Sequence, residues 1–187
     1  MCYNWQNNLK RDLSGTKFED FTVIEEDESI FVYDSITGKK YWTVDIPPVV
    51  KWTGMHSKII VYGAVTEDGR QLFKTYHRFD SESTVDYLKL LEKKFGKIFV
   101  ILDRAPQHRS RMVKEYLRDH KDTVKLRYLP RATPRMNAVE ECWRQGKYAV
   151  AVSETSKIMK YNISEYYRTV RFKNDYLYSK PRIPKDF

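Results

Sequence analysis

Three acidic positions in this sequence have the residue type and local setting that metal-dependent phosphate chemistry requires. Asp103 directly follows the apolar run Ile98–Leu102, Asp27 lies within the acidic run Glu25–Glu28, and Glu140 lies in a segment expected to start a helix. Each acid is therefore expected where a secondary element ends or starts. Carboxylates without a His or Cys ligand set suit Mg²⁺ or Mn²⁺. Two such ions about 4 Å apart can activate an attacking oxygen and stabilise a leaving oxygen at a phosphate.

Each of these acids also has an ordinary structural explanation. Asp103 could cap the helix that follows it, the run Glu25–Glu28 could be a solvated edge or turn, and Glu140 could simply favour the first turn of a helix. However, four adjacent carboxylates inside a strand repel one another and pack badly. Such a conflict with local preference is more typical of a functional site than of an ordinary strand.

Strand alternation divides the acidic run into two pairs. Glu25 and Asp27 share one face of a strand, and Glu26 and Glu28 share the other. The residues alone therefore leave Glu25 and Asp27 as alternatives for the first acid of the site.

The charge of the chain is unevenly distributed. The net charge is +9, but residues 1–103 hold 14 Lys and Arg against 16 Asp and Glu, whereas residues 104–187 hold 20 against 9. The second part therefore has a balance of +11, and its interleaved aromatic residues favour a polyanion partner, most simply DNA, over a generic solubilising surface. The proposed DNA contacts flank the acids in sequence: Arg104, His108, Arg109, Arg111, Arg131, Arg135, Arg144 and Lys147. Arg168, Arg171 and Lys173, set among tyrosines, are expected to add a phosphate or base-stacking contact.

Hydrophobic periodicity and turn residues predict one mixed α/β domain. Its boundaries are expected at 21–150, with a lead-in over 1–20 and a basic helical extension over 151–187. Strands are expected over residues 21–33, 40–44, 58–65, 71–76, 97–103 and 123–128. Helices are expected up to residue 95 after an N-cap within 81–84, then over 110–120 and 136–150, the last capped by Asn137.

Several classes of protein are disfavoured. Cys2 and Cys142 make neither a disulfide framework nor a metal-finger spacing. No apolar run approaches the roughly 20 residues of a membrane span, and no signal-peptide pattern opens the chain. We therefore expect a soluble, cytoplasmic, nucleoid-associated protein without a membrane partner.

Three motifs carry a family resemblance. They are Asp27-Glu28-Ser29, then Asp103-Arg104-Ala105-Pro106-Gln107-His108 after a hydrophobic strand, and a block with Leu129-Pro130, Pro134, Asn137, Glu140, Trp143 and Lys147. With these motifs the chain resembles the catalytic domain of mariner-like and insertion-sequence "six-thirty" transposases, the DDE group with an RNase H-like fold. The 36 residues between Asp103 and Glu140 are close to the spacing typical of that group. Arg104 departs from the usual Asn, and Ala138 stands where Pro is common.

The resemblance implies an RNase H-like mixed β-sheet flanked by helices, and a specific activity. Asp27, rather than Glu25, would join Asp103 and Glu140 in binding two Mg²⁺ or Mn²⁺ ions. Water would cleave DNA at the element ends, and the freed 3′-hydroxyl would attack target DNA. A homodimer on DNA and a helix-turn-helix reader, encoded separately or upstream, are implied as partners, because the motif at Asp27 leaves no room before it for a reader of about 50 residues.

Two other functions fit the same residues. The chain could be a catalytically retired relative that only binds DNA, or an RNase H-like nuclease that cuts without joining. For His108, a capping or packing role is the main alternative to a DNA contact.

Overall fold

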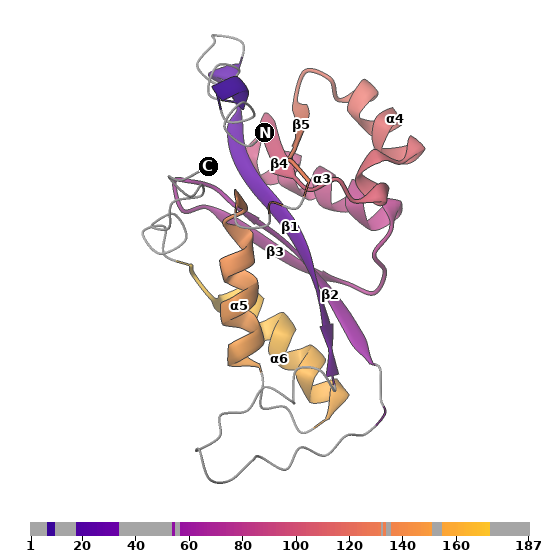
Figure 1. The fold of residues 1–187 in the computed structure, drawn as a ribbon, viewed down its shortest axis with the longest axis vertical. Helices are drawn as coiled ribbons and strands as arrows, with labels where there is room; N and C mark the ends of the chain where they lie inside the picture. The colour runs from indigo at the N-terminus through magenta and orange to yellow at the C-terminus, as the bar shows by residue number, and fades with distance from the viewer. Residues whose placement is uncertain are drawn as a thin grey trace.

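In the computed structural model, a five-stranded mixed sheet forms the centre of the molecule (Figure 1). The structure describes residues 7–9, 18–33, 54, 57–131, 133, 136–150 and 155–172. The strand order is β3-β2-β1-β4-β5, in which β1 pairs antiparallel with β2 and parallel with β4. The strands are β1 (Thr22–Val32), β2 (Lys58–Val65), β3 (Gln71–Tyr76), β4 (Ile98–Leu102) and β5 (Val124–Tyr128). The expected strand over 40–44 lies outside the described residues.

Helices cover both faces of this sheet. They are α3 (Ser81–Phe95), the short 3₁₀ helix η2 (Pro106–Arg109), α4 (Arg111–Asp119), α5 (Val139–Ala149) and α6 (Ser156–Thr169). Figure 1 shows α5 and α6 together on one side of the strands, with α3 and α4 on the other. None of the helices in the described ranges is long and apolar enough to cross a membrane.

The two faces of the sheet bury alternate residues of the same strands. On β2, Ile60 and Tyr62 pack in the core with α3 and α4, whereas Ile59 and Val61 pack in the core with α5 and α6. Successive side chains of a strand point to opposite faces, so a strand covered on both sides is typically apolar along its whole length. All five residues of β4 are buried, which confirms the interpretation of 98–102 as a strand buried on both faces.

The acidic run of β1 lies in the middle strand of the sheet, so neither a solvated edge nor a turn describes it. Asp27 also lies inside β1, which continues to Val32, and the expectation that it would end the strand is wrong. The expected N-cap of α3 is wrong as well, because the cap is Asp80, whose carboxylate accepts a hydrogen bond from the Ser83 backbone N–H at 2.9 Å.

Helix α6 belongs to the same core as α5. Met159, Ile163 and Tyr167 are buried with Trp143 of α5 in one cluster. The two helices approach closely at Gly146, where an added Cβ would lie 1.9 Å from the Tyr167 hydroxyl oxygen. That hydroxyl donates to the Cys142 carbonyl at 3.1 Å. The segment 173–187, part of the predicted basic extension, lies outside the described residues.

We expect Gly146→Ala to destabilise the protein by about 1–3 kcal/mol, because the new methyl group overlaps the Tyr167 ring. Tyr167→Phe alone should cost about 0.5–1.5 kcal/mol through its lost hydrogen bond. In the Gly146→Ala background Tyr167→Phe should cost less, since it removes the atom in closest overlap. Urea unfolding of the two single variants and the double variant measures this coupling. Strict additivity of the two changes would contradict the close approach of α5 and α6.

Candidate active site

The register between β1 and β4 brings the first two acids together. The parallel pairing joins Thr22 to Ile98 and Glu25 to Ile101. Two positions beyond the Glu25–Ile101 pair, the same register places Asp27 beside Asp103, which directly follows β4. A parallel pair aligns residues on the same face, so a mid-strand acid and a strand-end acid become neighbours.

The third acid is positioned by a helix whose start is hydrogen-bonded to β1. Asn137 Nδ2 donates to the Glu26 carbonyl at 2.7 Å, and the Ala138 backbone N–H donates to Glu25 Oε2 at 2.5 Å. Helix α5 begins directly afterwards, so Glu140 lies in its first turn. Glu25 therefore binds the helix start, whereas Asp27 faces the site, a distinction that strand alternation alone leaves open.

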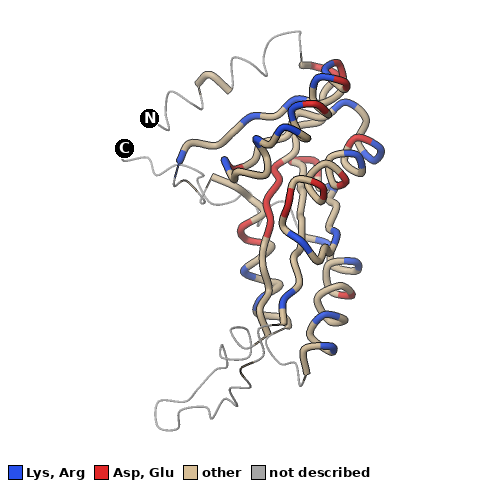
Figure 2. Tube along the Cα trace, turned by 90° about the vertical axis from the view of Figure 1, so that its right-hand side faces the viewer, with Lys and Arg blue, Asp and Glu red and all other residues tan. Residues whose placement is uncertain are grey.

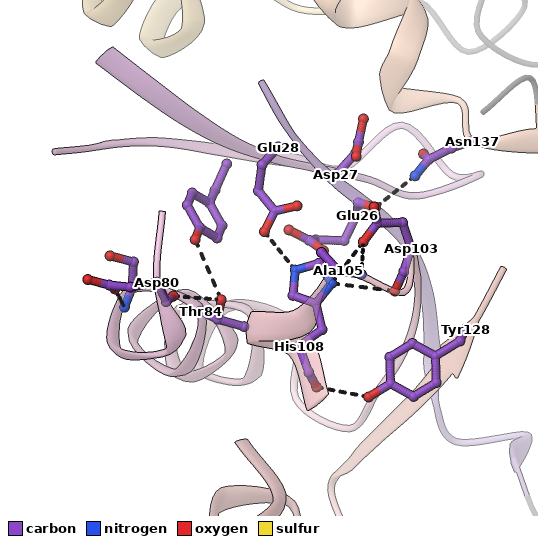
Figure 3. Close-up of polar contacts among 12 residues, drawn as sticks. Glu26, Asp27, Glu28, Asp80, Thr84, Asp103, Ala105, His108, Tyr128 and Asn137 are labelled. Atoms are coloured by element: carbon purple, nitrogen blue, oxygen red, sulfur yellow. Dashed lines mark hydrogen bonds and ion pairs between the residues drawn. The ribbon is translucent and has the colours of Figure 1, made fainter. Parts of the chain in front are cut away.

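All three predicted acids line one cavity of about 450 Å³. Asp27 of β1, Asp103 after β4 and Glu140 of α5 share it with Arg104 and Arg131. Figure 3 shows Asp27 and Asp103 close to Asn137, at the point where β1, the end of β4 and the start of α5 meet. The cavity lining combines acidic and basic side chains, an arrangement suited to a phosphate bound together with cations.

Asp27 is the most perturbed of the three acids. Its pKa is raised to about 7, mainly by burial, with a further contribution from the nearby charge of Glu140, and a hydrogen bond from Trp143 partly opposes the rise. Trp143 Nε1 donates to Asp27 Oδ2 at 2.8 Å. Burial likewise raises the pKa of Glu140. An oxygen-binding divalent cation would favour the ionised form of both groups, so this donor set fits Mg²⁺ or Mn²⁺.

Asp103 has the opposite electrostatics. Its side chain is 53% exposed, and His108 Nδ1 lies 3.1 Å from its Oδ1. The Ala105 backbone N–H donates to the same oxygen at 2.8 Å. The hydrogen bond from His108 lowers the pKa of Asp103, which is therefore ionised at neutral pH.

His108 is buried and ionised. Only 1% of the residue is exposed, and its Nε2 lies 2.7 Å from Glu28 Oε1 (Figure 3). Burial lowers the pKa of His108, but its hydrogen bonds to Asp103 and Glu28 and the nearby carboxylate charges outweigh that effect and raise it to about 11. This burial leaves the ring no surface for the DNA contact predicted from the sequence, and it favours the packing alternative.

Sequence reasoning missed the group on the other face of β1. Glu26, Glu28 and His108 offer ligand atoms that lie within 4.8 Å of one another. Burial and the charge of Glu28 raise the pKa of Glu26 well above its usual value. Alternation along the strand already places Glu26 and Glu28 on one face, and the Asp-x-Ala-x-x-His step contains His108. The missing information was that the two segments meet.

The predicted basic residues differ in where they lie. Arg104 and Arg131 line the cavity of the three acids, and Arg104 Nε donates to the Leu129 carbonyl at 2.9 Å. A second pocket of about 340 Å³ contains Glu140, Arg144 and Lys147. Figure 2 shows the acidic run of β1 in the middle of the fold, with Lys and Arg distributed over the surrounding elements. The other predicted contacts are Arg109, Arg111, Arg168 and Arg171, which are exposed, and Arg135 and Lys173, which lie outside the described residues.

A model of the DDE superfamily endonuclease family matches residues 22–160 of the chain. The chain belongs to this family. Comparison with curated proteins gives no match.

Solved structures are similar in fold. The Mos1 transposase paired-end complex with left transposon end matches with a TM-score of 0.64 and 12% identity, over 94% of this chain and 55% of that chain. The Mos1 transposase catalytic domain with raltegravir and Mg matches at 0.58 and 11%, over 95% and 83%. A simian T-cell lymphotropic virus intasome matches at 0.53 and 11%, over 87% and 56%. The predicted RNase H-like sheet flanked by helices is confirmed, and the chain spans 55% of the length of the Mos1 transposase chain in the paired-end complex.

We expect Asp27→Asn to stabilise the protein at pH 8 in the absence of divalent metal. The pKa of Asp27 is raised from 3.8 to about 7 in the fold, so ionisation of this carboxyl destabilises the native state progressively as the pH rises between these values. The amide keeps an acceptor for Trp143. The gain at pH 8 should be at least about 1 kcal/mol and should shrink toward pH 5, as measured by urea unfolding in EDTA.

Asp68→Asn is the matched control for this measurement. Asp68 lies in an exposed hairpin, where a hydrogen bond from Thr66 lowers its pKa. The same Asp-to-Asn change there should give no gain at pH 8. Equal responses of the two variants would mean that Asp27 is not buried as the structure describes.

Proposed function

We propose that this chain is the catalytic domain of a DDE transposase, which cleaves DNA strands and joins the freed 3′ ends to target DNA. The observation that carries the proposal is the single cavity lined by Asp27, Asp103 and Glu140 in a chain of the DDE superfamily endonuclease family. Solved transposase complexes with the same fold support it.

In this proposal Asp27, Asp103 and Glu140 hold two Mg²⁺ or Mn²⁺ ions. When bound, the ions supply Lewis-acid activation of the attacking oxygen and charge stabilisation for the leaving one. Mos1 catalytic-domain structures with Mg and with Mn have the same fold, which supports the choice of metal. The protein's own part is to hold its carboxylates in place, and the Trp143 N–H does so for Asp27.

The basic residues around the cavity are proposed to bind the DNA backbone. Arg104 and Arg131 would contact phosphates at the cavity, and Arg144 and Lys147 would continue the contact in the neighbouring pocket, which shares Glu140. Arginine and lysine at these positions neutralise phosphate charge without reading bases. Binding would therefore position a strand over the acids with little sequence preference.

Selection of the correct DNA ends is proposed to require more than this domain. The resemblance implies a helix-turn-helix reader, upstream in the same protein or encoded separately. It also implies a homodimer that holds two element ends together, and an enzyme working on chromosomal DNA at the nucleoid.

We expect Asp27→Asn, Asp103→Asn and Glu140→Gln each to abolish metal-dependent cleavage, because each change removes one negative ligand from the cation site. The measurement is nicking and strand transfer on labelled DNA with Mg²⁺ or Mn²⁺. Asp68→Asn, the same kind of change away from the cavity, should cleave like the wild type. Wild-type cleavage by one of the three variants would remove that residue from the site. Nicking without joining would identify a nuclease, and DNA binding without nicking by the wild type would identify a retired relative.

DNA affinity should fall steeply with salt, because phosphate neutralisation releases counterions. Arg131→Glu and Lys147→Glu should each weaken binding to all duplexes alike and reduce the salt slope by about 1. Lys89→Glu makes the same charge change at an exposed position of α3, among the helices on the other face of the sheet, and should bind nearly as the wild type does. Fluorescence anisotropy across a salt series measures all three. Equal slopes for Arg131→Glu and Lys89→Glu would count against the proposed DNA surface.

A further inference from the structure

A chain of buried contacts runs from the far face of β1 to the acid that follows β4. The side chains of Glu28 and His108 are 3% and 0% exposed and lie 2.7 Å apart. The side chain of Asp103 is 53% exposed, with its Oδ1 3.1 Å from His108 Nδ1. Two buried groups therefore hold one acid that faces the cavity (Figure 3).

We propose that Glu28 and His108 are positioning residues, which fix the carboxylate of Asp103 in the orientation that the cleavage reaction requires. This inference rests on the proposed function, in which Asp103 is a metal ligand. Glu28 would then act on the site from the face of β1 opposite to Asp27, without contact to metal or DNA.

Asp103 needs such support because of where it lies. Strand β4 ends at Leu102, so the sheet ladder no longer holds the residue. Its orientation depends on two donors, the Ala105 N–H and the His108 ring, and both reach Oδ1. Within the described part of the chain, no donor contacts Oδ2, which leaves that oxygen available for a cation.

The His108 ring in turn depends on Glu28. A carboxylate only accepts hydrogen bonds, so a ring held between two carboxylates donates from both nitrogens. The hydrogen bond from Nε2 to Glu28 restricts rotation of the His108 ring. The ring therefore presents Nδ1 in a fixed direction to Asp103. Hydrogen bonds between charged groups are strong where water is excluded, as it is around both of these side chains.

Partners that orient a metal ligand typically change metal affinity or activity by about 10–100-fold when they are removed. We expect Glu28→Ala to weaken Mn²⁺ binding within this range and to raise the Mn²⁺ concentration needed for half-maximal cleavage, with the DNA concentration for half-saturation unchanged. Glu28→Gln keeps an acceptor for the His108 N–H without the charge. It should fold like the wild type and lose less Mn²⁺ affinity than Glu28→Ala.

Tyr62→Phe is the matched control. Tyr62 is the direct cross-strand partner of Glu28 on β2, is fully buried, and has its hydroxyl 3.5 Å from the Thr84 hydroxyl rather than in the contact chain. Removing that hydroxyl disturbs the same region of the core. It should leave the Mn²⁺ dependence unchanged even if it lowers the unfolding free energy.

A double-variant cycle separates positioning from general damage. Mn²⁺ binding is measured by calorimetry for Glu28→Gln, Asp103→Asn and the pair. If Glu28 acts through Asp103, Glu28→Gln has no further effect in the Asp103→Asn background. Additive losses would overturn the inference, as would an unchanged Mn²⁺ affinity in Glu28→Ala that remains folded by circular dichroism.

Pulsed electron paramagnetic resonance of bound Mn²⁺ tests the competing arrangement, in which His108 itself binds metal together with Glu26 and Glu28. We expect no ¹⁴N coupling from an imidazole ligand in the wild type, and such a coupling would overturn the positioning role. The proposed function fails in a different way: a wild-type protein that neither binds Mn²⁺ nor cleaves DNA refutes it. If the wild-type protein is active and the Glu28→Ala variant binds Mn²⁺ as tightly as the wild type, only the positioning role is refuted.

Discussion

Burial of an unbroken acidic run in the middle strand of the sheet is the constraint on which the rest of the structure depends. A carboxylate removed from water destabilises the fold unless it gains partners. The structure gives Glu25 the backbone N–H of Ala138, gives Asp27 the indole of Trp143, and gives Glu28 the ring of His108. Two of these partners belong to the start and first turns of α5 and the third to the 3₁₀ helix η2, so satisfying the acids also assembles the cavity.

The position of α5 follows from the same constraint. Its start is hydrogen-bonded to β1 through Glu25 and Asn137, and its first turn then delivers Glu140 to the cavity. The Trp143 ring lies over β2 at Gly63, where an added Cβ would come within 2.5 Å of that ring. The side-chain size at position 63, on β2, is therefore restricted, because Trp143 must lie over it to donate a hydrogen bond to Asp27.

The sequence predicted the elements well because their signals are local. The apolar run 98–102, the strands over 58–65 and 71–76, and the end of α3 at residue 95 depend on periodicity and turn residues alone. The cap of α3 was misplaced because Ser81, Ser83 and Thr84 are residue types that cap helices as readily as Asp80 does.

The three acids were found through motif resemblance, but their partners were not. Period-2 alternation assigns Glu26 and Glu28 to a face without saying what covers it. The burial of His108 and its bonds to Glu28 and Asp103 depend on a meeting of segments 80 residues apart, for which a single sequence has no local signal. The same reason explains why alternation left Glu25 and Asp27 as alternatives, since only the approach of α5 distinguishes them.

The long reach of these contacts governs when the site can form during synthesis. The hydrogen bonds from Trp143 to Asp27 and from Ala138 to Glu25 span 116 and 113 residues. Contacts between residues so far apart in sequence close large loops. Closing such a loop costs chain entropy before the contact contributes any stabilising energy, so these contacts form late in folding. A nascent chain that has released only β1 to β4 from the ribosome still has a hydrated acidic strand without its third acid. The cavity therefore gains its full set of three acids only after α5 has emerged, and a shorter nascent chain lacks Glu140.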